Sequence, residues 1–120
     1  MLRFVVLIHD HPALHWDFML EKEAALRTWR LDRPPTEAGP IPAEAIANHR
    51  LAYLDYEGPV SGGRGTVTAF DRGEYSLLVD DGHVVAVELR GTRLEGFGEL
   101  KRLPNTNRWE FQFTPEAAPS

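Results

Sequence analysis

The sequence predicts a mainly β protein, an antiparallel β-barrel of about eight strands with one short helix and a proline-rich loop. Short apolar or alternating segments recur along its 120 residues. Turn sequences such as Asp80-Asp81-Gly82 and Gly91-Thr92 join many of these segments, as in β-hairpins. Closing such a set of short strands into a barrel removes the exposed sheet edges, so we expect a closed sheet.

The first two strands carry the clearest patterns. Residues 3–9 have a continuous apolar centre, which is typical of a strand buried on both sides. Residues 14–21 alternate strictly, with leucines and aromatics on one face, as in a half-buried strand. Further strands are expected at 25–31, 66–71, 74–79, 83–90, 94–103 and 108–113, with 51–57 also extended and a hairpin turn at Arg72-Gly73.

The remaining segments are expected to be irregular or helical. Residues 32–42 contain four prolines and should form a loop. Residues 43–48 are the one plausible helix, with Pro42 near its first position. Residues 58–65 form a glycine-rich bend. We expect one domain over residues 1–113 and a disordered tail over 114–120.

Composition excludes several classes of protein. The chain has no cysteine, so thiolate metal sites, disulfides and cysteine nucleophiles are excluded. No segment reads as a signal peptide or a membrane span, and we expect a cytoplasmic protein without membrane contact. The formal net charge of −5 argues against a surface that coats DNA broadly. Arg27, Arg30 and Arg33 form the one basic cluster of note, which we interpret as solvated surface.

The segment 9–21 carries the strongest chemical signal. On an alternating strand, His15 and Asp17 project from the same face, roughly 7 Å apart along the backbone. His9 precedes a proline-containing turn and can fold back over that face. Two imidazoles and a carboxylate are a common ligand set for Mn, Fe or Zn. A polar strand end and an exposed strand face would place the same residues, so both interpretations stay open on local grounds.

The other histidines carry weaker signals when each is taken alone. His11 lies beside Pro12 in a turn, and His83 opens a strand after a turn, so both are expected on the surface. His49 ends the expected helix, where an imidazole suits the helix dipole. Local pattern alone therefore assigns none of the three to a site.

Four motif blocks, in order along the chain, resemble the 3′-phosphoesterase domain of bacterial DNA ligase D, the DNA polymerase ligase N-terminal domain family. The first is a histidine followed after five residues by His-aromatic-Asp-Phe-x-Leu-Glu. The second joins a histidine, a tyrosine four residues on and an acidic-aromatic Glu-Gly. The third is Gly-Gly-x-Gly-Thr-Val followed by Asp-Arg-Gly, and the fourth is Leu-x-Gly with an alternating strand. In this sequence the blocks are His9 with 15–21, His49 with Tyr53 and 55–58, 62–67 with 71–73, and 94–103.

The resemblance implies a barrel with a hydrophilic crater at one end and a manganese-dependent phosphoesterase, with Zn²⁺ or Co²⁺ as other possible ions. Such enzymes remove 3′-terminal ribonucleotides or 3′-phosphates and leave a 3′-hydroxyl. By matching position, the metal ligands would be His9, His15 and Asp17. His49 and Tyr53 would be the catalytic residues that contact the scissile phosphate, with His49 as general acid or stabiliser of the transition state.

The phosphate-binding residues depart from the family pattern. The family has arginine where this chain has Met19, two residues after the ligand aspartate, and a second arginine at the position of Ile41. Methionine and isoleucine offer no donor to a phosphate. By neighbourhood, Arg50, Arg64 and Arg3 are the candidate replacements. The length of the chain suggests a short standalone form of the domain.

The substrate would be a nucleic-acid 3′ end or another phosphoester, and a separate DNA-repair ligase or polymerase would be a partner. Three alternatives stay open. The first is a catalytically weak or inactive barrel that binds metal and nucleic-acid ends or repair partners. The second uses His15, Asp17 and a distal histidine as the facial triad of an iron oxygenase. The third is a structural barrel whose histidines have no chemical role.

Overall fold

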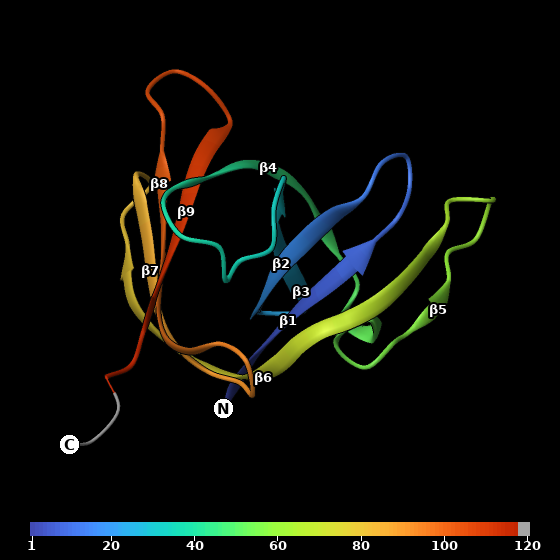
Figure 1. Ribbon diagram of the computed structural model, residues 1–120, viewed down its shortest axis with the longest axis horizontal. Coiled ribbons are helices and arrows are strands. Elements are labelled where there is room, and N and C mark those ends of the chain that lie inside the picture. The colour runs from blue at the N-terminus through green and yellow to red at the C-terminus, as the bar shows by residue number, and fades with distance from the viewer. Residues whose placement is uncertain (118–120) are drawn as a thin grey trace.

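A computed structural model describes residues 1–117, and nearly all of their regular structure is antiparallel sheet. The strands follow one another round a ring in the order β1-β2-β3-β4-β9-β8-β7-β6, and β6 pairs back to β1 (Figure 1). This closed ring confirms the predicted antiparallel β-barrel. The elements are β1 (Leu2–His9), β2 (His15–Lys22), β3 (Ala25–Leu31), β4 (Ile41–His49), the 3₁₀ turn η1 (Leu51–Leu54), β5 (Gly58–Pro59), β6 (Thr66–Asp80), β7 (Val84–Arg90), β8 (Glu95–Arg102) and β9 (Arg108–Pro115).

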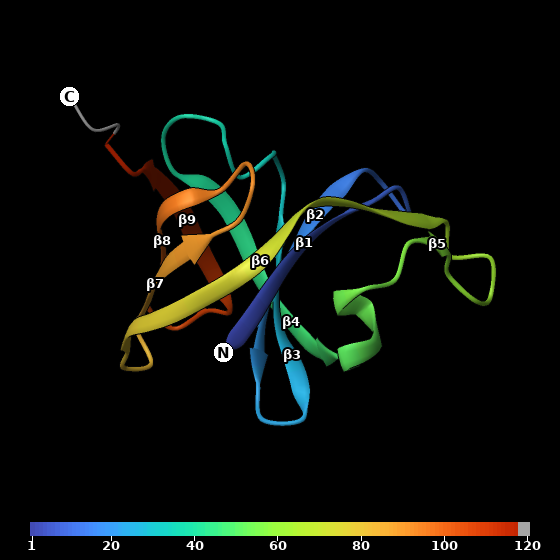
Figure 2. The same cartoon turned by 90° about the horizontal axis from the view of Figure 1, so that it is seen from below.

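The strand β6 closes the barrel by serving two neighbours in turn. Its first part pairs with β1 and its last part with β7, so that Glu74 lies opposite both Arg3 and Arg90. Figure 2 shows β6 crossing the molecule from β5 to β7. Its pairing register shifts once in each half, opposite Val6/Leu7 and at Leu77/Val79. Such bulges increase the local twist and bend that closure requires.

The interior of the ring is a large apolar core to which all eight ring strands contribute. Trp29 packs edge-on against Trp109, and Phe18 packs against Phe111 with ring centroids 5.0 Å apart. Each of these aromatic side chains is almost completely buried. The alternation of β2 therefore has its predicted effect, because Phe18 and Leu20 face this core.

A second, smaller apolar cluster lies on the opposite face of β1 and β2. It joins Val5 and Leu7 of β1 to Met19 of β2, and Leu54 of η1 covers it. Val6, between Val5 and Leu7, belongs to the barrel interior, so this second cluster lies outside the barrel wall. The segment from η1 to β5 thus forms a second layer over β1 and β2, and the candidate site lies between these layers.

The helix predicted at 43–48 is wrong, because these residues belong to the strand β4. Their alanines favour a helix locally, but Ile41 and Ala43 alternate into the barrel core, and β4 pairs with both β3 and β9. Tertiary pairing overrides a weak local propensity here. The one helical element is instead the 3₁₀ turn η1 among the described residues, and it lies within the segment 51–57 that we expected to be extended.

The hairpin turn expected at Arg72-Gly73 is also absent, since β6 runs unbroken through both residues. Gly73 permits a close approach between strands, because a Cβ there would overlap the carbonyl oxygen of Arg90. At the other end of the chain, Thr114 and Pro115 continue β9 by pairing with β8. The rest of the expected tail includes 118–120, which lie outside the described residues. Within residues 1–117, we find no helix with the length and apolar character needed to cross a membrane.

Candidate metal centre

The hairpin of β1 and β2 brings His9, His15 and Asp17 together on the outer face of the barrel wall. His9 lies directly opposite His15 in the register, and Asp17 is the next residue along that face. The Asp17 carboxylate lies 3.3 Å from Nε2 of His15 and 3.7 Å from Nδ1 of His9. Ligand atoms from all three residues lie within 4.8 Å of one another. The fold thus converges the three predicted ligands on one point, on the outer wall rather than in the lumen at one end of the barrel.

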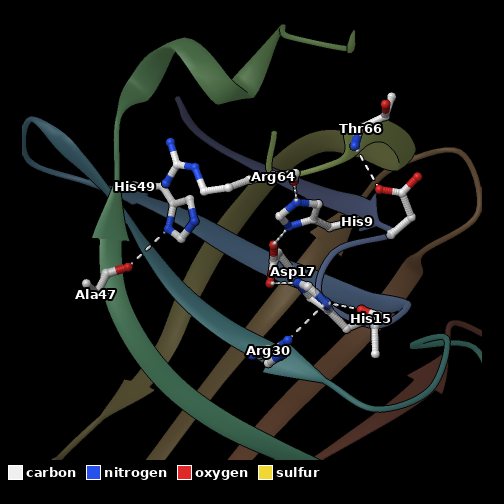
Figure 3. A network of polar contacts seen from close by, with 10 residues as sticks. His9, His15, Asp17, Arg30, Ala47, His49, Arg64 and Thr66 are labelled. Carbon is white, nitrogen blue, oxygen red and sulfur yellow. Dashed lines mark hydrogen bonds and ion pairs between the residues drawn. The ribbon is translucent and has the colours of Figure 1, made fainter. Parts of the chain in front are cut away.

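Both imidazoles use their far nitrogen to contact a backbone carbonyl (Figure 3). Nδ1 of His15 lies 2.8 Å from the oxygen of Ala13, and Nε2 of His9 lies 2.7 Å from the oxygen of Arg64. Because a carbonyl only accepts, each of these nitrogens carries the proton and donates it. The nitrogens that face Asp17 are then the ones with free lone pairs. A backbone acceptor that fixes the ring in this way is the usual outer support of a metal-binding histidine.

The Asp17 carboxylate is the least satisfied group in the site. The residue is 2% exposed, and its Oδ1 has no hydrogen-bond partner in the described part of the chain. Burial of a carboxylate without donors is costly unless a cation compensates it. The two histidine nitrogens with free lone pairs and this carboxylate oxygen fit a divalent ion such as Mn²⁺ or Zn²⁺. Such an ion would keep coordination positions for further ligands.

Electrostatics favour positive charge at this point. Burial is the largest single influence on His15 and lowers its pKa, but Asp17 and the Ala13 carbonyl together outweigh it, so the pKa of His15 is raised. The face of β2 that we expected to be exposed is buried, since His15 is only 5% exposed. The second layer of the fold covers it, which a strand pattern taken alone does not show.

His9, His15 and Asp17, called the triad from here on, open into a pocket of about 420 Å³. The pocket lies between the outer barrel wall and the segment from η1 to β5. His49 and Tyr53 line the other side of this pocket, with their rings in edge contact at 5.7 Å between centroids. Nδ1 of His49 contacts the carbonyl of Ala47 at 3.0 Å. The fold therefore brings both predicted catalytic residues to the same pocket as the triad. His11, expected at the surface, is exposed at its rim.

A β-bulge aims His49 at the pocket. Ile46 lies opposite Thr28, but His49 lies opposite Leu26, so β4 has one residue more than β3 over this stretch. Without that extra residue, the alternation that turns Ala43 and Ala45 inward would point His49 into the barrel. The bulge reverses the face and places the imidazole on the outer side, with Leu26 of the second cluster.

The three predicted phosphate-binding arginines are distributed differently. Arg50 and Arg64 line the pocket, while the guanidinium of Arg64 donates to the carbonyl and the hydroxyl oxygen of Ser61. Arg3 does not line it, because its guanidinium is paired with Asp55 at 2.7 Å. That carboxylate holds the pKa of Arg3 above its usual range.

The expected basic cluster of three arginines does not exist as one surface. Arg27 pairs with Asp80 and lies over the ring of Trp29, and Arg33 pairs with Glu37. Arg30 lies opposite Asp17 in the register of β2 and β3 and lines the pocket. Sequence reasoning missed Arg30 as a site residue. A two-residue turn at Glu23-Ala24 pairs Lys22 with Ala25, and this register places Arg30 opposite Asp17.

The two positions that depart from the family pattern differ in their surroundings. Met19 is buried in the second cluster and lines the pocket, so the residue after Asp17 on that face brings no cation. Ile41 is fully buried in the barrel interior. A side chain at position 41 therefore points away from the pocket in this fold.

Comparison with known proteins identifies the family of this chain. The family model of the DNA ligase D 3′-phosphoesterase domain matches residues 8–102. A multifunctional non-homologous end joining protein LigD of Pseudomonas aeruginosa is 33% identical over 113 residues, which is 85% of this chain and 13% of the relative. The protein of the same name from Mycobacterium bovis is 32% identical over 115 residues, which is 88% of this chain and 15% of the relative. The chain thus spans about one seventh of the length of these relatives, and it belongs to the DNA ligase D 3′-phosphoesterase domain family.

Proposed function

We propose that this protein is a divalent-metal-dependent phosphoesterase that acts on the 3′ end of a nucleic acid and removes a 3′-phosphate or a 3′-terminal ribonucleotide. The observation that carries the proposal is the buried Asp17 carboxylate, which has an oxygen without a hydrogen-bond partner among residues 1–117 and two histidine nitrogens with free lone pairs beside it. This group faces His49 across a single pocket. A family whose domain is a phosphoesterase supports the same reaction class.

His9, His15 and Asp17 would hold the ion, and manganese is the ion we propose, with zinc or cobalt as substitutes. Their mixed nitrogen and oxygen donor set suits these metals. When bound, the ion supplies Lewis-acid polarisation of a phosphoryl oxygen and lowers the pKa of water. The two backbone carbonyls that hold the imidazoles keep their donor atoms pointed at one position.

The opposite side of the pocket would bind the phosphate and assist the leaving group. Because Nδ1 of His49 is engaged with Ala47, Nε2 is the nitrogen left for a substrate. In the protonated imidazole, Nε2–H donates to the leaving oxygen or stabilises its developing charge. The hydroxyl of Tyr53 donates to a phosphate oxygen beside it, and Arg50 and Arg64 provide positive charge at the rim.

The substrate class follows from charge and from the relatives. The net charge of −5 argues against a broad basic surface, so we propose that recognition is confined to the end of a strand that enters the pocket. The relatives are named as non-homologous end joining proteins. A repair ligase or polymerase, either separate or joined to this domain, would then use the 3′-hydroxyl that this reaction leaves.

The test is incubation of the protein and manganese with a primer–template that ends in a 3′-phosphate or a 3′-ribonucleotide. We expect the wild type to convert both ends to a 3′-hydroxyl and Asp17→Ala to lose at least about 10³-fold in rate. His83→Ala is the matched control, since His83 is exposed in the turn between β6 and β7. It should retain full activity.

Two results would overturn the proposal. Equal activity of wild type and Asp17→Ala would mean that the reaction does not depend on this site. Manganese binding without turnover on either end, in folded protein and with Zn²⁺ and Co²⁺ also tested, would favour the alternative of an inactive metal-binding barrel.

A further inference from the structure

We propose that Arg30 binds the scissile phosphate directly at the triad. The inference rests on the proposed function, because it names a residue that would hold the substrate of that reaction. Arg30 extends from β3 on the outer face of the barrel wall, directly opposite Asp17 of β2. It lines the pocket together with His49 and Tyr53. A phosphate held by a cation at Asp17 would therefore lie beside this guanidinium.

Arg30 is the arginine side chain that contacts the triad. Its Nη2 lies 3.3 Å from Nδ1 of His15 (Figure 3). Arg64 also reaches the triad, but through its backbone carbonyl on His9. The guanidinium of Arg64 is held by Ser61 instead. Arg30 thus meets the His15 ring at the nitrogen that faces away from Asp17, and its side chain lines the pocket into which the triad opens.

Within residues 1–117, we find no acceptor that fully engages the guanidinium of Arg30. Nδ1 of His15 lies closer to the Ala13 carbonyl, at 2.8 Å, and donates its proton there, so it offers Arg30 no lone pair. Among the described residues, no carboxylate forms an ion pair with Arg30, whereas Arg27 and Arg33 both have such partners. Five donors in a planar fork are then available for an oxyanion.

The neighbouring strand β2 provides no cation to bind a phosphate next to Asp17. On the same face of β2, the residue that follows Asp17 is Met19, which is buried among apolar side chains and cannot donate to a phosphate. A guanidinium and a metal ion close together repel each other unless an anion lies between them. A phosphate that bridges both would relieve this repulsion, and guanidinium–phosphate pairs are bidentate and strong.

The experiment compares Arg30→Ala and Arg30→Lys with Arg27→Ala, the matched control on the same strand. The measurements are kcat/KM on the 3′-phosphate primer–template and manganese affinity by calorimetry. We expect Arg30→Ala to lower kcat/KM by about 10- to 100-fold, the loss of a charge-assisted hydrogen bond. Arg30→Lys should recover part of the activity, and all three variants should bind manganese as the wild type does.

Two outcomes, one kinetic and one of metal binding, would overturn the inference. Unchanged kcat/KM in Arg30→Ala would show that the guanidinium does not touch the phosphate. A parallel loss of manganese affinity would show that Arg30 only positions His15. Circular dichroism establishes that each variant is folded, and Arg30→Lys decides the question if Arg30→Ala does not fold.

The inference can be separated from the proposed function. If the folded wild type leaves both 3′-blocked ends intact, the proposed function fails, and fluorescence anisotropy with manganese then tests Arg30 alone. Tighter binding of a 3′-phosphate than of a 3′-hydroxyl oligonucleotide, lost in Arg30→Ala and kept in Arg27→Ala, would sustain the phosphate contact. Equal binding of the two ends by the wild type would reject it.

Discussion

Two buried aspartates of this barrel have opposite surroundings. The difference indicates which carboxylate supports the fold and which one is a candidate for binding a ligand. Asp71 of β6 is 6% exposed and accepts hydrogen bonds from the backbone N–H groups of Thr92, Arg93 and Leu94. Asp17 of β2 is buried more deeply, yet one of its oxygens has no partner in the part of the chain that the structure describes. Among the described residues, the fold satisfies the first carboxylate and leaves an oxygen of the second without a donor, at the place where we propose a cation.

The region around Asp71 explains one of the family motifs in structural terms. The carboxylate holds the turn between β7 and β8, and a Cβ at Gly91 would overlap it. Arg72, the next residue, donates to the carbonyl of Leu54 and so ties η1 to β6. Gly73 allows β7 to approach closely. The block Asp-Arg-Gly is therefore a packing motif that supports the second layer, while the block with His15 and Asp17 supplies the side chains of the proposed metal site.

The largest effect on stability is expected for Asp71→Ala. This change leaves three backbone donors without their acceptor, and we expect a loss of about 3 kcal/mol in the free energy of unfolding. Urea unfolding followed by tryptophan fluorescence measures it. Asp71→Asn keeps one carbonyl oxygen and should lose less.

Asp17→Ala is the matched opposite of this change. It removes a carboxylate that the protein itself barely satisfies, so without metal we expect a change within about 1 kcal/mol. If Asp17→Ala destabilised the metal-free protein as strongly as Asp71→Ala, the contrast between the two aspartates would be wrong.

The next effect is stabilisation by metal. A ligand that binds only the folded state at 100 times its dissociation constant adds about 2.7 kcal/mol of stability. We expect manganese to raise the melting temperature of the wild type and of Asp71→Asn, but not that of Asp17→Ala. Differential scanning fluorimetry with and without EDTA checks this. A manganese-dependent shift that survives in Asp17→Ala would place the ion elsewhere.

Much of the fold could be predicted because strand signals in this chain are local. The alternation in β2 and the turn residues between the later strands predict a strand and hairpins from neighbouring residues alone. The exceptions depend on pairing that is distant in sequence. The alanines of β4 favour a helix until β3 and β9 pair with them, and the Arg72-Gly73 step favours a turn until β6 bridges β1 and β7.

The positions of the candidate site residues could be predicted to a similar degree, and for the same reason. His15 and Asp17 share a face by period alone, and the register then adds His9 opposite His15. His49 reaches the pocket only because β4 contains a bulge, and the residues of β4 do not predict that bulge. Arg30 was missed because a cluster of charges usually indicates solvent, and only the register of β2 and β3 shows which of the three arginines faces the triad.

A third aspartate gives the smallest expected effect and shows what an ordinary surface ion pair contributes. Asp80, at the end of β6, is paired with Arg27 at 3.2 Å and Lys22 at 3.4 Å. Burial, the largest single influence, raises its pKa, but the two cations together outweigh it, so the pKa of Asp80 lies below its usual value of 3.8. Because the folded pKa is depressed, the ion pairs stabilise the protein above about pH 4, and this contribution is lost as the pH falls through the folded pKa.

We therefore expect Asp80→Asn to cost at most about 1 kcal/mol at pH 7, since the charges are partly solvated and screened. The cost should shrink in unfolding experiments as the pH falls below about 4, and 1 M NaCl should reduce it at pH 7. A cost that stays constant from pH 7 to pH 3 would mean that the carboxylate acts through shape rather than charge. Asp80 would then resemble Asp71, whose role is to fit the backbone around it.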